Sequence, residues 1–165
     1  MRVLGIDPGT LHLGYGIVEQ TNGEISLIHC GAFNLSSKIP VERRLSSLYH
    51  KLNDIIARYS PDEVAIEEPF VADNARSALA LGRSQTVAIL AAANVNLPVF
   101  RYSPAEVKLQ VTSYGNSSKE QVQEMVRIQL KIDQPIKSSD ASDALAVAIC
   151  HFYHRQFNNL LAKGY

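Results

Sequence analysis

Four acidic residues lie at the ends of segments whose patterns predict strands or helices. Asp7 ends a short apolar strand directly before a Pro-Gly turn, and Glu67 ends a second buried strand. Asp140 and Asp143 open the last predicted helix three residues apart, so they lie on one face of its first turn. If the two strands are parallel neighbours in a mixed sheet, Asp7 and Glu67 emerge side by side. A helix docked nearby then adds the other two carboxylates.

Carboxylates gathered in this way repel one another, which raises their pKa values unless a cation neutralises them. The set offers only hard oxygen ligands, without Cys or His. Such ligands suit Mg²⁺, which keeps bound water and binds substrate phosphates. Two such ions about 3.5–4 Å apart activate a water and stabilise the leaving oxygen when a phosphodiester is cleaved. The pattern therefore predicts a metal-dependent site for phosphodiester cleavage.

Each acid also has an ordinary structural explanation. Asp7 fits a turn residue before Pro-Gly, and Glu67 fits a solvated strand exit. Asp140 and Asp143 fit an N-cap and an acid that complements the helix dipole. No single residue decides between these explanations and a shared site. The combination favours the shared site, because every acid falls at the edge of an element that one site could join.

The elements that must position these acids are predicted from hydrophobic periodicity and turn signals. We expect strands at residues 2–6, 14–20, 24–34, 63–67 and 97–102. We expect helices at residues 41–59 and 75–93, from residue 103, from 117 to about 131, and from near 140 to about 156.

Short motifs mark several boundaries. Asn22-Gly23 is a two-residue hairpin signal, and Ser103 with Glu106, like Ser117 with Glu120, predicts a capping box at a helix start. The order of elements predicts a single α/β domain over residues 1–156, with a mixed five-stranded sheet and helices on both faces. Residues 157–165 are expected to form a C-terminal tail.

At 165 residues, with 46% hydrophobic and 19% charged residues, the chain has the length and composition of one globular domain. No apolar run reaches the roughly 18 residues of a membrane-spanning helix, and the first residues show no signal-peptide pattern. Cys30 and Cys150 belong to no motif, and we expect both to be reduced core residues. These features predict a cytoplasmic protein without a membrane partner.

The net charge is zero, from 16 basic and 16 acidic residues, which by itself argues against a nucleic-acid partner. The charges are unevenly distributed, however. Basic residues outnumber acidic residues between Arg101 and Lys131, and Arg76 and Arg83 lie in an acid-free stretch. A basic face around an acidic pocket would sum to zero, so composition leaves the partner open.

With these motifs in place, the chain resembles the bacterial RuvC-type Holliday junction resolvases, a branch of the ribonuclease-H-like nucleases. The likeness extends to about residue 152 and rests on GIDPGTLHLGYG (5–16), AIEEPF (65–70), NARSALALGRSQTVAILAAAN (74–94), LPVFRYSPAEVK (97–108), SYGNSSKEQVQEMV (113–126) and SDASDALAVAI (139–149). The resemblance implies a ribonuclease-H-like nuclease domain. It also implies that Asp7, Glu67, Asp140 and Asp143 are metal-binding catalytic acids. Glu68 stands where the family varies and is not included.

The resemblance implies roles for residues that are not acidic. Phe70 matches an aromatic residue that stacks on an unpaired base near the crossover, a contact worth about 1–3 kcal/mol per base. Lys108 and Lys119 match basic residues near the scissile phosphate. Gly115 and Asn116 fit a flexible loop that approaches DNA. Taken alone, Phe70 also fits cover for a hydrophobic edge, and the lysines also fit solvated helix faces.

The chain departs from the family pattern in two places. Asp73 stands where relatives usually have a lysine, and its charge would repel phosphate, although Arg76 one turn later compensates as a DNA contact. Some relatives have histidine at the position of Asp140. Outside the pattern, His151 and His154 have the spacing of a metal pair. They lie at the far end of the last helix, however, so we expect them to be structural or solvent-facing.

The function implied by the resemblance is a Mg²⁺-dependent endodeoxyribonuclease that resolves four-way DNA junctions in recombination and repair. It implies two Mg²⁺ ions per site on DNA, with Mn²⁺ as a substitute. It also implies a homodimer that nicks strands of like polarity symmetrically, which suits a two-fold junction, and handover from a branch-migration motor. The helix at 75–93 is a candidate dimer surface because it is rich in small residues, or else it packs on its own sheet.

Three other functions fit part of the pattern. Actin-like and sugar-kinase ATP-binding proteins share the GID-x-GT opening, but they need a second domain to enclose nucleotide. A junction-binding scaffold without catalysis is possible in principle, yet all four acids are present. A related branch that processes ribosomal RNA shares the opening motif, but its chains are typically shorter and lack the ASDALA-type helix start.

Overall fold

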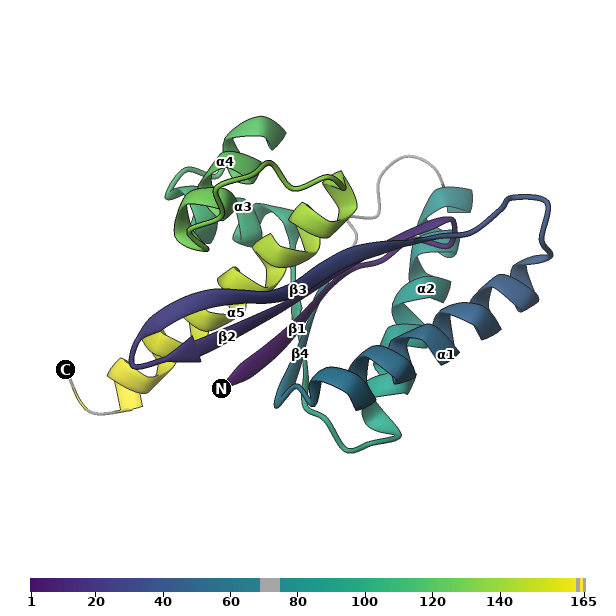
Figure 1. The fold of residues 1–165 in the computed structure, drawn as a ribbon, viewed down its shortest axis with the longest axis horizontal. Coiled ribbons are helices and arrows are strands. Elements are labelled where there is room, and N and C mark those ends of the chain that lie inside the picture. The colour runs from purple at the N-terminus through teal and green to yellow at the C-terminus, as the bar shows by residue number, and fades with distance from the viewer. Residues whose placement is uncertain (69–74, 163, 165) are drawn as a thin grey trace.

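In the computed structural model of this chain, the described residues are 1–68, 75–162 and 164, and the side chain of Arg76 lies outside the description. The described residues form one five-stranded sheet in the order β3-β2-β1-β4-β5 (Figure 1). Its strands are β1 (Arg2–Asp7), β2 (His12–Thr21), β3 (Glu24–Asn34), β4 (Glu63–Glu67) and β5 (Val99–Tyr102).

Strands β1, β2 and β3 form an antiparallel meander, whereas β4 runs parallel to both β1 and β5. The helices are α1 (Val41–Tyr59), α2 (Ala75–Ala93), α3 (Pro104–Thr112), α4 (Lys119–Gln129) and α5 (Ser139–Ala162). Figure 1 shows α1 and α2 on one face of the sheet and α3, α4 and α5 on the other. The predicted mixed sheet with helices on both faces is therefore confirmed.

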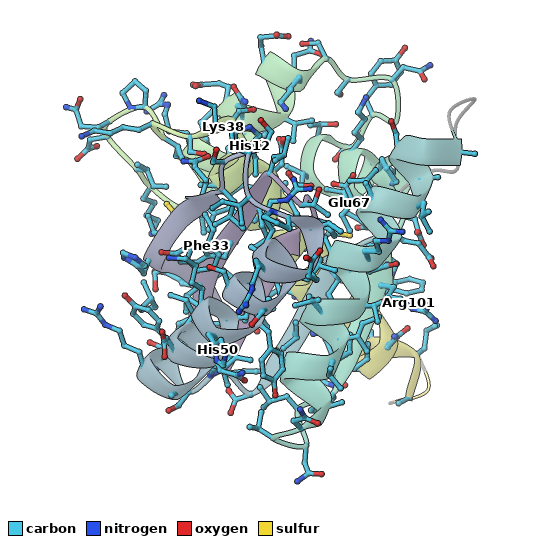
Figure 2. All side chains as sticks on the ribbon, turned by 90° about the vertical axis from the view of Figure 1, so that its right-hand side faces the viewer. His12, Phe33, Lys38, His50, Glu67 and Arg101 are labelled. Atoms are coloured by element: carbon cyan, nitrogen blue, oxygen red, sulfur yellow. The ribbon has the colours of Figure 1, made fainter. Side chains whose placement is uncertain are left out.

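Two hydrophobic cores result, one on each face of the sheet. Because side chains alternate along a strand, Leu4 and Ile6 of β1 face α1 and α2, where they pack with Leu48 and Leu52. Figure 2 shows the molecule from the side on which α1 and α2 lie. Val3 lies on the opposite face, in the core that α3, α4 and α5 cover. The same alternation puts Asp7 on the face of Val3, which is the face that α5 covers.

Glycines in the central strands let α5 lie directly on the sheet. Gly5 of β1 and Gly16 of β2 are register partners. A Cβ added to Gly5 would overlap the carbonyl oxygen of Ala144, and one added to Gly16 would overlap the side chain of Leu145. The first turns of α5 therefore approach β1 and β2 with no side chain from these positions between them.

Most predicted boundaries are confirmed. Helices α1 and α2 and strands β3 and β4 have the predicted bounds, and the capping box of Ser103 and Glu106 opens α3. Asn22 and Gly23 both have positive φ angles, of 53° and 86°, as a two-residue hairpin turn with this sequence requires. Local signals are strong at each of these places.

Several predicted boundaries are wrong. Strand β2 extends over His12–Thr21 rather than 14–20, β1 ends at Asp7 rather than at residue 6, and β5 begins at Val99 rather than at residue 97. Two helices also differ from the prediction. Helix α4 is capped by Ser118 with Gln121 rather than by Ser117, because the buried Ser117 hydroxyl donates to the Tyr114 carbonyl instead. Helix α5 ends at Ala162 rather than near 156, so most of the segment expected as a tail is helical. Residues 157–162 contain neither Gly nor Pro, so nothing in this segment stops the helix once it passes the sheet.

Replacing Gly5 with alanine should destabilise the protein, because the new methyl group would force α5 away from β1. We expect a loss of about 1–3 kcal/mol in the free energy of unfolding. The matched control is Gly82→Ala in α2, where an added Cβ meets no atom within 4 Å and alanine favours the helix by about 0.5–1 kcal/mol. Urea unfolding measures both, and equal effects of the two substitutions would contradict the close packing.

Candidate active site

Asp7 and Glu67 end two neighbouring parallel strands. Ile6 of β1 pairs with Ile66 of β4, so the next residue on each strand is one of the two acids. Both acids lie on the α5 face, because Gly5 and Ala65, two residues earlier, are also register partners on that face. The parallel register therefore brings the two carboxylates together at the carboxyl end of β1 and β4.

The first turn of α5 brings in Asp140 and Asp143. A Cβ on Gly14 would overlap the carbonyl oxygen of Asp140, and Gly14 is the register partner of Asp7. The helix start needs no aspartate as a cap, because the Ser138 hydroxyl accepts a hydrogen bond from the Ala141 amide at 3.3 Å. The explanation of Asp140 as an N-cap is therefore wrong.

The four acids form one electrostatic cluster. Burial raises the pKa of Asp7 to about 8, with further contributions from the charges of Glu67, Asp143 and Asp140. Burial also raises the pKa of Glu67 to about 7, and the charge of Asp143 adds to this shift. Both carboxyl groups thus hold their protons far more strongly than they would in water.

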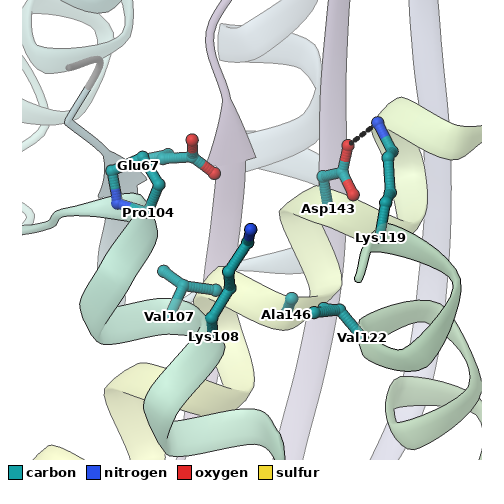
Figure 3. A pocket seen from close by; sticks show the side chains of 8 residues that line it. All are labelled: Glu67, Pro104, Val107, Lys108, Lys119, Val122, Asp143 and Ala146. Carbon is teal, nitrogen blue, oxygen red and sulfur yellow. Dashed lines mark ion pairs between the residues drawn. The ribbon is translucent and has the colours of Figure 1, made fainter. Parts of the chain in front are cut away.

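Two lysines face the acids across a cleft of about 200 Å³. Figure 3 shows Glu67 entering the cleft from one side and Asp143 from the other, with the side chain of Lys108 rising from α3. The ammonium of Lys119, the first residue of α4, lies 2.7 Å from Asp143 Oδ2. The hydrogen bond to Asp143 raises the pKa of Lys119. Apolar side chains complete the lining, namely Pro104, Val107, Val122 and Ala146.

The chemistry of this donor set fits a hard divalent cation. It consists of carboxylate oxygens alone, and a cation would reverse the repulsion that contributes to the raised pKa values of Asp7 and Glu67. Within residues 1–68, 75–162 and 164, no three His, Cys, Asp or Glu side chains already stand at the distances of a formed metal centre. In this arrangement the Lys119 ammonium is the positive charge that pairs with Asp143.

Some predicted site residues cannot be placed in this cleft. Phe70 and Asp73 lie outside the described residues, as does the side chain of Arg76, so their roles stay predictions. Gly115 and Asn116 are exposed in the turn that precedes α4.

Glu68, which was not included among the acids, forms an ion pair with Arg101 at 3.5 Å instead of joining the cluster.

Sequence reasoning missed one set of buried polar residues on the elements that carry the acids. His151 is fully buried, as expected for a structural residue, but it bridges Tyr102 and Glu63, to which no role was assigned. The available signal was Glu63 itself, a charged residue that opens an otherwise apolar buried strand.

Comparisons with known proteins agree over almost the whole chain. The family model described as crossover junction endodeoxyribonuclease RuvC matches residues 3–151. A curated protein of that name from Dehalococcoides mccartyi strain BAV1 is 51% identical, over 99% of this chain and 98% of the relative. Another from Syntrophotalea carbinolica is 47% identical, over 98% of this chain and 99% of the relative.

Solved structures give the same result. The structure titled T. thermophilus RuvC in complex with Holliday junction substrate superimposes with a TM-score of 0.91 at 31% identity, covering 96% of each chain. The yeast mitochondrial Holliday junction resolvase Ydc2 has a TM-score of 0.63 at 16% identity, covering 90% of this chain and 76% of the other, and so shares the fold alone.

Removing one charge from the cluster should stabilise the metal-free protein. Between the ordinary pKa of Asp7, 3.8, and its folded value of about 8, the folded state holds a proton that the unfolded state has released. Stability therefore falls as pH rises through this interval. We expect Asp7→Asn to raise the melting temperature at pH 8 in EDTA. The rise should be roughly 2–4 °C for each kcal/mol by which the substitution increases the free energy of unfolding.

Thermal melts from pH 5 to 8.5 measure this effect. Asp54→Asn, on the exposed face of α1, removes the same charge away from the cleft and is the control. An Asp7→Asn variant that melts at or below wild type at pH 8 would show that the acids are not strained.

Proposed function

Because this chain belongs to the crossover junction endodeoxyribonuclease RuvC family, it resolves Holliday junctions, and we propose that Asp7, Glu67, Asp140 and Asp143 form its catalytic centre. The family is one of metal-dependent nucleases, so the reaction is hydrolysis of phosphodiester bonds in junction DNA. The observation that carries the assignment is the convergence of four carboxylates at the carboxyl end of β1 and β4.

We propose Mg²⁺ as the resident cation, with Mn²⁺ as a substitute, because the donor set is made of hard oxygens. A bound pair of such ions would activate the attacking water and stabilise the leaving oxygen. Asp7 and Glu67 would hold them from the strand ends, and Asp140 and Asp143 from α5. The protein's own contribution is to keep these four groups together despite their repulsion.

The two lysines are proposed to bind the scissile phosphate. Lys119 has its ammonium on Asp143 in the free protein. Once Asp143 is neutralised by a cation, that ammonium becomes available to a phosphate oxygen in the same cleft. Lys108 lines the cleft from α3, and its charge lowers the pKa of Glu67, which helps to keep this carboxylate ionised.

The remaining partners follow from the substrate. A four-way junction presents equivalent strands in pairs, so we propose a homodimer that makes two symmetric nicks in strands of like polarity. Exposed Leu79 and Leu90 on α2 support this helix as the dimer surface. We propose Phe70 as the residue that stacks on an unpaired base and Arg76 as a phosphate contact.

Two further proposals concern the setting of the reaction. No helix in the described part of the chain is long and apolar enough to cross a membrane. We propose that the protein acts on DNA in the cytoplasm and receives junctions from a branch-migration motor.

Cleavage of a synthetic, mobile four-way junction tests the catalytic centre. Wild type should make paired nicks with Mg²⁺ and none in EDTA. Asp7→Asn should bind the junction in a gel-shift assay but cleave it at least about 100-fold more slowly, because a carboxylate that would hold the cations at the reacting phosphate is lost. Binding without cleavage by wild type in every divalent metal would contradict the proposed centre.

Neutralising Lys119 should separate catalysis from binding. We expect Lys119→Gln to lower the single-turnover cleavage rate by roughly 10- to 100-fold, while junction affinity changes much less, because one phosphate contact among many is lost. Lys131→Gln is the matched control, since Lys131 pairs with Glu24 beside the β2-β3 hairpin. Equal losses of rate in both variants would show that Lys119 acts only through overall charge.

A further inference from the structure

A buried polar network links the first residue of β4 and the last residue of β5 to the middle of α5. His151 of α5 is fully buried, and its Nε2 lies 2.6 Å from Glu63 Oε2 of β4. Its Nδ1 lies 2.7 Å from the hydroxyl of Tyr102 in β5. Arg155, one turn further along α5, lies 2.9 Å from the second oxygen of Glu63. We call these four residues the polar clamp.

The partners define the direction of each hydrogen bond in the clamp. Arg155 donates to Glu63 Oε1. Burial lowers the pKa of His151, although the hydrogen bond to Glu63 opposes this shift, and we assign a neutral imidazole. Nε2–H then donates to Glu63, and Nδ1 accepts from the Tyr102 hydroxyl. Three elements are thus joined by directional bonds.

The clamp and the acids occupy matching positions on the two elements. Glu63 precedes Glu67 by four residues on the same face of β4, a distance of roughly 13 Å along a strand. His151 follows Asp143 by eight residues on α5, which is roughly 12 Å along a helix. Tyr102 is also the register partner of Glu67. The clamp therefore fixes how α5 and β4 are aligned along their lengths, and joint metal binding by Asp143 and Glu67 needs the same alignment.

The contact between α5 and the strands at Gly5 is made of small side chains. Ala144 and Ala148 of α5 lie over Gly5, and Ala65 is the register partner of Gly5 on β4. Small side chains permit close approach, but apolar burial is not directional. Hydrogen bonds require defined distances and angles, so the clamp restricts the axial position of α5 more sharply than this contact does.

We propose that Glu63, Tyr102 and His151 are positioning residues, which fix α5 along β4 and so hold Asp143 opposite Glu67 for joint metal binding. This inference rests on the proposed function of the acid cluster. A displacement of about 1 Å in a catalytic group can lower a rate by about 100-fold. None of the clamp residues lines the cleft between Glu67 and Asp143, so the clamp acts through the position of Asp143.

Tyr102→Phe tests the proposal with the smallest change, because it removes one hydroxyl and keeps the ring. His151→Leu removes both of the imidazole's hydrogen bonds. We expect both variants to bind a four-way junction within about twofold of wild type, since the lysines are unchanged. We expect kcat to fall by roughly 10- to 100-fold and the Mg²⁺ concentration for half-maximal cleavage to rise severalfold.

A second readout needs no DNA and no catalysis. A cation that binds only the folded state raises the melting temperature. Mn²⁺ or Mg²⁺ should therefore raise the melting temperature of wild type more than that of Tyr102→Phe. The matched control is Ile56→Val, which weakens the core on the other face of the sheet. It should leave kcat and the metal requirement unchanged at a temperature where all variants are folded.

Each outcome decides the proposal. If Tyr102→Phe keeps the kcat, the metal requirement and the metal-induced stabilisation of wild type, the proposal is overturned. Equal losses in Ile56→Val would also overturn it, because the clamp would then act only on stability. If His151→Leu does not fold, Tyr102→Phe alone decides. If wild type cleaves no junction, the proposed function fails instead. The metal-induced shift of Tyr102→Phe against wild type then still tests the clamp.

Discussion

The architecture depends on the direct contact between the start of α5 and the two strands beneath it. Gly5, Gly14 and Gly16 leave no side chain at the points where the backbone or the side chains of α5 approach the sheet. Any larger residue would separate the helix from the strands by the width of a methyl group or more. Because Gly14 is the register partner of Asp7, the same contact decides how near Asp140 and Asp143 lie to the strand-end carboxylates. Packing and chemistry are therefore set by one interface.

The same interface creates an electrostatic cost. Burial and neighbouring charges raise the pKa values of Asp7 and Glu67 to about 8 and about 7, so the metal-free cluster is strained near neutral pH. The Lys119 ammonium relieves part of this strain at Asp143. A divalent cation would relieve more, because it would act on several carboxylates at once. A site that is unfavourable when empty has stronger affinity for the ion that neutralises it, at the expense of folding stability.

Local signals predicted much of the fold, whereas long-range pairings decided the rest. The apolar stripe of α1 and the Asn22-Gly23 turn depend on neighbouring residues only. The meeting of Asp7 with Glu67 was predicted on the condition that their strands are parallel neighbours, and the Ile6–Ile66 register supplies that condition. The pairing of Glu63 with His151 joins residues 88 positions apart, and although Glu63 is unusual in its strand, no local pattern identifies His151 as its partner. Ser117 and Ser118 fit a capping box equally well in sequence, and burial of the Ser117 hydroxyl decides between them.

The contact between α5 and the sheet has opposite electrostatic character at its two ends, and this contrast explains how the helix stays in place. At its start, Asp140 and Asp143 are repelled by Asp7 and Glu67, and the positive end of the helix dipole offsets only part of that repulsion. At its other end, the Glu63 carboxylate lies between His151 and the cationic Arg155 and attracts the helix. The packing of α5 on Gly5, Gly14 and Gly16 sets how closely helix and sheet approach. The hydrogen bonds of the attractive end add defined distances and angles, and so restrict further where the repulsive end lies. A nuclease of this design can tolerate a strained metal site because its alignment is fixed by residues that take no part in the chemistry.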